Sequence, residues 1–122
     1  MPQVSTLFYR EGEDIPVLDW LDLIPDEPRE RVRRQLQRLA DTGHEARRPL
    51  VENLGDDIYE LRTRVGRVNY RILFSFHGRN AVLLTCGFTK EREIPADELR
   101  RARQRLQEFR ADPGNHYAEM EG

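Results

Sequence analysis

The sequence has little cysteine, lysine or histidine, and each scarcity excludes a class of site. Cys86 is the only cysteine among 122 residues, so the chain can form neither an internal disulfide nor a cysteine zinc site. The three histidines are far apart and lack metal-ligand spacing. No glycine-rich phosphate loop or nucleophile elbow is present. We therefore expect no metal and no small-molecule cofactor.

Long apolar runs are also missing. No stretch of 18 apolar residues exists, so we expect no membrane span. The N-terminus, MPQVSTLFYREGED, lacks a basic region followed by an apolar stretch, so we expect no signal peptide and a cytoplasmic location. Charged residues make up 34% of the chain and hydrophobic residues 38%, which indicates one small globular domain. We assign this domain to residues 1–111 and expect a loose tail over 112–122.

The charge is unevenly distributed. Residues 1–28 hold one basic and seven acidic side chains, a net charge of −6, whereas residues 29–79 hold twelve basic and seven acidic, a net charge of +5. A basic middle segment points to a polyanion or an acidic partner, although a solvated arginine-rich helix face would give the same count. Lys90 is the only lysine, and lysine can exchange a proton where arginine cannot.

Hydrophobic periodicity and turn residues predict seven elements in the order β-α-α-β-β-β-α. A first strand spans 4–10, a helix begins at Pro16, and a second helix is capped by Asp26 and ends at Gly43. Three strands span 57–65, 68–76 and 81–88, and a last helix begins at Pro95. This pattern is typical of an α+β domain with a small, mainly antiparallel sheet.

The dipeptide Gly66-Arg67 fits a two-residue hairpin turn, and that turn fixes the register of two strands. One face then pairs mostly apolar residues, which supports the register. On the other face Arg62 stands opposite Arg71, where like charges repel. Either an anion lies between the two guanidinium groups, or Glu60, two residues along the strand, neutralises them.

Four segments together resemble a known toxin superfamily. They are Tyr59-Glu60-Leu61-Arg62, Tyr70-Arg71-Ile72-Leu73-Phe74, Leu83-Leu84 with Gly87-Phe88-Thr89-Lys90, and the helix residues Pro95, Glu98, Ala102 and Arg105. The N-terminal FYREGEDIPVLDWLDLIP extends the likeness over nearly the whole chain. The chain resembles the RelE/ParE toxin superfamily, and most closely its HigB-like, phage-derived branch.

This resemblance implies a compact sheet with helices packed on one face and a basic, concave opposite face. It implies the toxin of a type II toxin–antitoxin system, acting as a metal-independent, ribosome-dependent endoribonuclease on messenger RNA in the ribosomal A site. It also implies a cognate antitoxin, usually a helix-turn-helix protein encoded by the adjacent gene.

By the same resemblance, Arg62, Arg71 and Lys90 match the family's site residues. The sequence departs from the pattern at two positions, where Glu91 replaces a frequent second lysine and Cys86 replaces a frequent histidine. Both departures remove polar or basic character near the expected site.

Metal-free RNA cleavage uses the 2′-hydroxyl as nucleophile, and cations where charge develops contribute most. We expect Arg62 and Arg71 to clamp the phosphate from one exposed strand face, and Lys90 to supply a proton or a further cation. His116 is a catalytic candidate because a tail can fold back over a small sheet. Further candidate contacts to nucleic acid are Arg64, Arg67, Arg92 and Tyr117. His44 and His77 are expected to face solvent.

Two other functions stay open at this point. A non-cleaving module of the same fold would inhibit DNA gyrase, as ParE-type relatives do, or persist as a degenerate antitoxin-binding protein. A plain interaction protein would use its acidic N-terminal segment and basic middle only to complement each other.

Overall fold

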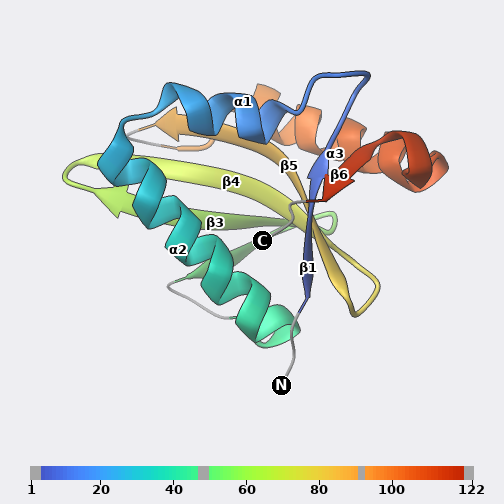
Figure 1. Ribbon diagram of the computed structural model, residues 1–122, viewed down its shortest axis with the longest axis horizontal. Helices are drawn as coiled ribbons and strands as arrows, with labels where there is room; N and C mark the ends of the chain where they lie inside the picture. Colours follow the sequence, from blue (N-terminus) through green and yellow to red (C-terminus); the bar gives the residue numbers. More distant parts are fainter. Residues whose placement is uncertain (1–3, 47–49, 91–92, 120–122) are drawn as a thin grey trace.

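The computed structural model describes residues 4–46, 50–90 and 93–119 (Figure 1). Its helices are α1 (Pro16–Leu23), α2 (Asp26–Thr42) and α3 (Ala96–Ala111), with short 3-10 turns at Gly43–Glu45 and Pro113–Asn115. Its strands are β1 (Ser5–Tyr9), β2 (Val51–Gly55), β3 (Ile58–Val65), β4 (Val68–His77), β5 (Ala81–Lys90) and β6 (Tyr117–Glu119). All seven predicted elements are therefore present, together with two strands that were not predicted.

The six strands form one sheet in the order β2-β3-β4-β5-β1-β6. Strand β1 runs parallel to β5, and every other neighbouring pair is antiparallel. The prediction of an α+β domain with a mainly antiparallel sheet is confirmed.

The β3–β4 hairpin has the predicted register. Gly66 takes φ +64°, a conformation that glycine adopts without strain, and seven residue pairs follow from Tyr59–Phe74 to Val65–Val68. Arg62 stands opposite Arg71 and Arg64 opposite Asn69. The hairpin turn thus positions the residues on which the site prediction depends.

Helices cover both faces of the sheet, so the prediction of helices on one face is wrong. One buried cluster joins α1 and α2 to one face through Val17, Val32, Leu61, Ile72 and Phe74. A second cluster joins α3 to the other face through Leu73, Leu83, Ala102, Leu106 and Phe109. In Figure 1, α2 crosses in front of the sheet and α3 lies behind it. The two central strands, β4 and β5, are consequently buried on both sides.

The helix boundaries follow ordinary end signals. Pro16 opens α1, where its missing N–H costs nothing, and Gly43 ends α2 with φ +56°. Asp26 lies in the first turn of α2 and makes no capping hydrogen bond; its carboxylate instead pairs with Arg29 at 3.0 Å. No helix within the described residues is both long and apolar enough to cross a membrane.

The described part of the C-terminal segment that we expected to be loose, as far as Glu119, joins the sheet. After the turn at Pro113–Asn115, β6 pairs antiparallel with β1, with Tyr117 opposite Tyr9. The main-chain N–H of Arg10 also donates to the carbonyl of His116 at 3.0 Å. These pairings give the segment a defined place at one edge of the sheet.

Candidate nucleic-acid interface

The expected site lies where the β3–β4 hairpin turns, on the face of the sheet that also carries α3. The backbone register places Arg62, Arg71 and Phe88 in one row across β3, β4 and β5, and Arg64, Asn69 and Lys90 in the next row. We call this region the hairpin end. It brings together the strand residues that the sequence singled out, with Lys90 placed by its backbone alone, because its side chain lies outside the described part.

Arg71 is buried, which corrects the expectation of two exposed arginines. Its side chain is 6% exposed, and its Nη1 donates to Oε2 of Glu60 at 2.8 Å. The Glu60 side chain is itself only 1% exposed. A buried guanidinium requires an anionic partner, since water cannot replace one there. The charge of Arg71 is therefore paired with Glu60 and is not presented to a ligand.

Arg62 remains accessible but is held by carboxylates. Its side chain is 42% exposed; Nε donates to Oε1 of Glu60 at 3.0 Å, and Nη2 forms an ion pair with the same oxygen at 2.7 Å. Nη2 also lies 3.8 Å from Oε2 of Glu52 on the adjacent strand β2. Of the two explanations for the facing arginines, an anion between them or neutralisation by Glu60, the second is observed. The Glu60 carboxylate contacts both guanidinium groups.

We define the Glu60 cluster as Glu52, Glu60, Arg62 and Arg71. It combines two carboxylates with two guanidinium groups, so its formal charges balance. The sequence identified Glu60 as a possible neutraliser, but Glu52 was missed because β2 was not predicted. The register of β2, which sets Glu52 opposite Glu60, is what brings this second carboxylate to the site.

Arg64 and Arg67 of the hairpin end face solvent. Arg64 is exposed, and its Nε donates to the carbonyl of Gly66 at 3.0 Å, which keeps it beside the turn. Arg67 is exposed within the turn. Arg92, a further candidate contact, lies outside the described residues. Arg62, Arg64 and Arg67 thus leave three accessible guanidinium groups at this end of the sheet.

His116 and Tyr117 are not part of the hairpin end. They lie next to β1, at the edge of the sheet opposite β2, with β4, β5 and β1 between them and β3. The His116 ring stacks on Tyr9 with centroids 5.6 Å apart, and its Nδ1 is 3.0 Å from the Arg10 carbonyl. The structure therefore does not bring His116 together with Arg62 or Arg71.

The other two histidines are exposed, as expected, but they also pack on aromatic rings. The ring of His44 stacks on Phe76 with centroids 4.1 Å apart, and the rings of His77 and Phe109 form a T-shaped pair with centroids 4.9 Å apart. Neither stands in the rows of the hairpin end. All three histidines of the chain are thereby placed away from the candidate site.

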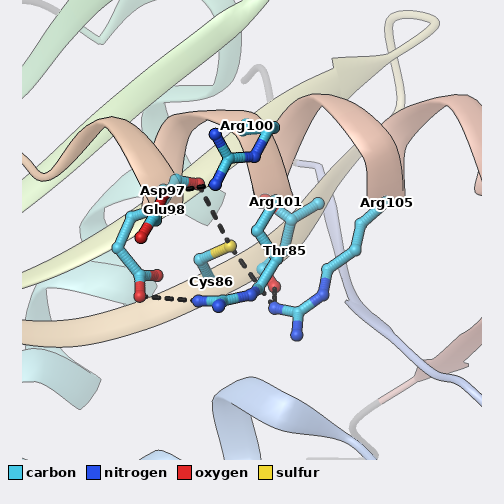
Figure 2. Close-up of polar contacts among 7 residues, drawn as sticks. All are labelled: Thr85, Cys86, Asp97, Glu98, Arg100, Arg101 and Arg105. Atoms are coloured by element: carbon cyan, nitrogen blue, oxygen red, sulfur yellow. Dashed lines mark hydrogen bonds and ion pairs between the residues drawn. The ribbon is translucent and has the colours of Figure 1, made fainter.

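Cys86 occupies the same face one row farther from the turn, in register with Leu73 and Glu60. It is covered by α3: Sγ lies 3.3 Å from Nη1 of Arg105 and 3.8 Å from the Glu98 carbonyl (Figure 2). Burial raises the pKa of the Cys86 thiol above its usual value. A neutral, covered thiol packs the sheet against α3 and is no nucleophile.

Arg105 fastens α3 to the sheet. Its Nη1 donates to the main-chain carbonyl of Thr85 at 2.7 Å (Figure 2), and its guanidinium lies 5.6 Å from the centroid of the Tyr9 ring. Figure 2 also shows two exposed ion pairs along α3, Arg100 with Asp97 and Arg101 with Glu98. Arg105, which carries part of the family resemblance, thus has a structural role here.

Comparison with known proteins identifies the family. No curated protein matches the chain. The family described as "Phage derived protein Gp49-like (DUF891)" matches residues 19–107, which contain Arg62, Arg71 and Lys90 but not His116. This range covers most of the chain and all of β2 to β5. The chain therefore belongs to the phage-derived Gp49-like family, within the RelE/ParE-like toxin group.

Proposed function

We propose that this protein is the toxin of a type II toxin–antitoxin system, of the HigB-like kind, and cleaves messenger RNA in the ribosomal A site. Membership of the Gp49-like family supports a toxin role. The observation that carries the RNA target is the gathering of exposed Arg62, Arg64 and Arg67 at the hairpin end, where Arg64 is in the same row as Lys90. Such guanidinium groups match the spacing of phosphate oxygens.

The reaction needs no metal or cofactor. The 2′-oxygen attacks the adjacent phosphorus, a 2′,3′-cyclic phosphate forms, and the bond to the 5′-oxygen breaks. Arg62 would hold a non-bridging oxygen as charge develops there. Lys90 would give a proton, or simply its charge, to the leaving 5′-oxygen. The 2′ proton would pass to water, because all three histidines lie away from the hairpin end.

This proposal changes the role expected for Arg71. Because its guanidinium is buried against Glu60, Arg71 acts through the Glu60 cluster and does not touch RNA. The contacts to the nucleic-acid backbone fall to Arg62, Arg64 and Arg67, with Lys90 and Arg92 as candidates from the sequence.

The proposed partners follow from the same biology. The antitoxin would be a helix-turn-helix protein encoded by the adjacent gene, and it would neutralise the toxin by tight binding in the cytoplasm. The resemblance to HigB-like proteins supports this pairing.

Mapping of RNA 5′ ends after brief expression tests the proposal. The wild type should produce new 5′ ends within translated codons, and the cuts should disappear when translation is blocked or the adjacent gene is co-expressed. Arg62→Ala and Lys90→Ala should reduce the cuts strongly. Arg33→Ala changes an exposed arginine of α2, the helix on the other face of the sheet; it is the matched control and should cut like the wild type. Absence of translation-dependent cuts by the wild type would contradict the proposal.

A non-cleaving module that inhibits gyrase is the second candidate. The balanced charges of the Glu60 cluster favour it, since two of the basic side chains are already paired with carboxylates. Intact transcripts together with relaxed or broken DNA after expression would identify this alternative.

Retained cleavage by Lys90→Arg would show that the Lys90 ammonium supplies charge and not a proton to the cleavage reaction.

A further inference from the structure

The carboxylate of Glu60 is almost fully buried, although it is on the same face of the sheet as the exposed arginines. Its side chain is 1% exposed, while that of Arg62, two residues along β3, is 42% exposed. Burying a carboxylate without partners is costly, so its contacts must compensate for the lost water. Those contacts reach both arginines of the row.

The two oxygens of Glu60 are divided between the two arginines. Oε2 accepts from Nη1 of Arg71 at 2.8 Å, deep in the face. Oε1 accepts from Nε of Arg62 at 3.0 Å and lies 2.7 Å from its Nη2, nearer the surface. Arg71 thereby fixes the Glu60 carboxylate from below, and the carboxylate holds one side of the Arg62 guanidinium.

We propose that Glu60 is a positioning residue that presents Arg62 to a backbone phosphate of RNA. Neither contact to Glu60 uses Nη1 of Arg62, so this nitrogen is available to an anion that approaches from solvent. A long side chain that is already held in place loses less freedom when it binds, which strengthens the bound state. This inference rests on the proposed cleavage of RNA and deepens it.

Glu52 adds a second consequence. Its carboxylate lies 3.8 Å from Nη2 of Arg62, on the same side that Glu60 holds. Both carboxylates therefore contact Nη2, at one end of the guanidinium, and neither of these contacts involves Nη1. Arg64 provides the internal comparison: it is on the same face, but it is held by the Gly66 carbonyl and not by Glu60.

A double-mutant cycle on cleavage tests the proposal. In a reconstituted translation reaction, Arg62→Ala should lower kcat/KM by about 10- to 100-fold, the range for one charge-assisted contact. In the Glu60→Gln/Arg71→Gln background the same Arg62→Ala change should cost less than about threefold. That background removes both partners of the buried ion pair together, so we expect it to disturb the fold less than Glu60→Gln alone, which removes only the carboxylate that Arg71 contacts.

Arg64→Ala is the control that distinguishes positioning of Arg62 from a merely structural role of Glu60. Its effect on kcat/KM should be equal in the wild-type and Glu60→Gln/Arg71→Gln backgrounds, since Arg64 does not touch Glu60. Equal coupling of Glu60 to Arg62 and to Arg64 would overturn the positioning role while leaving the proposed function intact. A wild type that does not cleave RNA during translation would overturn both.

Discussion

The indole of Trp20 in α1 lies directly over the backbone of Gly87 in β5. A Cβ atom at position 87 would come within 2.6 Å of Cδ2 of Trp20, closer than Cβ atoms approach other groups. Gly87 faces the α1 side of the sheet, in register with Ile72. The glycine of the Gly-Phe pair therefore has a packing function, because only a residue without a side chain lets the ring lie this close to the strand.

Gly87→Ala should lower the free energy of unfolding by about 1–3 kcal/mol, because the added methyl overfills the contact with Trp20. Thermal or urea unfolding measures the change. Gly114→Ala is the control, since nothing lies within 4 Å of the Cβ it would add. In a Trp20→Leu background Gly87→Ala should cost much less; an unchanged cost there would show that another contact is responsible.

Arg29→Ala should destabilise the protein by about 1–2 kcal/mol, because Arg29 in α2 satisfies the carbonyls at the C-terminal end of α1. Its Nε donates to the Leu21 carbonyl at 2.7 Å and its Nη2 to the Ile24 carbonyl at 2.8 Å. The positive charge of Arg29 also interacts favourably with the negative, C-terminal end of the α1 dipole. Urea unfolding of Arg29→Ala and of exposed Arg33→Ala makes the comparison. Equal losses in the two variants would refute the capping role.

The β3–β4 hairpin could be predicted in full from local sequence. A glycine-first, two-residue turn between alternating strands permits one register, and any shift by one residue would turn the apolar side chains outward. The opposition of Arg62 and Arg71 followed from that register. Their contact with Glu60 could also be anticipated, because residues 60 and 62 share a face.

Strand β2 could not be recognised, because its turn lacks the usual residues. Asp56 and Asp57 take φ +53° and +65°, where Asn-Gly is the common pair and Asp-Asp is rare. The register also shifts between Asn53 and Gly55, which disrupts the alternation. Without β2, the sequence provided no reason to place Glu52 beside Arg62.

The packing of α3 on the face of the sheet opposite α1 and α2 could not be predicted from alternation of apolar and polar residues along the strands. In β5 the run Ala81-Val82-Leu83-Leu84 is apolar at every position, which indicates burial on both faces. The resemblance instead led us to place all helices on one side. Burial of Arg71 could not be predicted either, since alternation along β4 shows which face a residue is on and not how deeply its side chain is buried there.

Cys86 should react slowly with a disulfide reagent while the protein is folded. It is 1% exposed, and burial raises the pKa of its thiol, so little thiolate is present at pH 8. As the only cysteine it gives an unambiguous signal. Reaction with dithionitrobenzoate should be slow in buffer and fast in urea, where the chain is unfolded. A native thiol that reacts as fast as the unfolded one would contradict the packing under α3.

Tyr9 should make the protein sensitive to alkaline pH. Burial, and then the hydrogen bond and negative charge of Glu108, raise the pKa of the Tyr9 phenol well above its usual value of about 10. The folded state therefore keeps a proton that the unfolded state loses. This stabilisation is complete below pH 10 and declines above it, by at most about 1.4 kcal/mol per pH unit.

Measuring the melting temperature between pH 9 and pH 11 tests this linkage. The wild type should lose stability steeply above pH 10, whereas Tyr9→Phe should lose it less steeply because it has no phenol to ionise. At pH 7 Tyr9→Phe should cost about 1 kcal/mol for the lost hydrogen bond to Glu108. Glu108→Gln should also flatten the alkaline decline, because it removes the negative charge beside the phenol. Parallel declines in all three proteins would show that Tyr9 is not the group responsible.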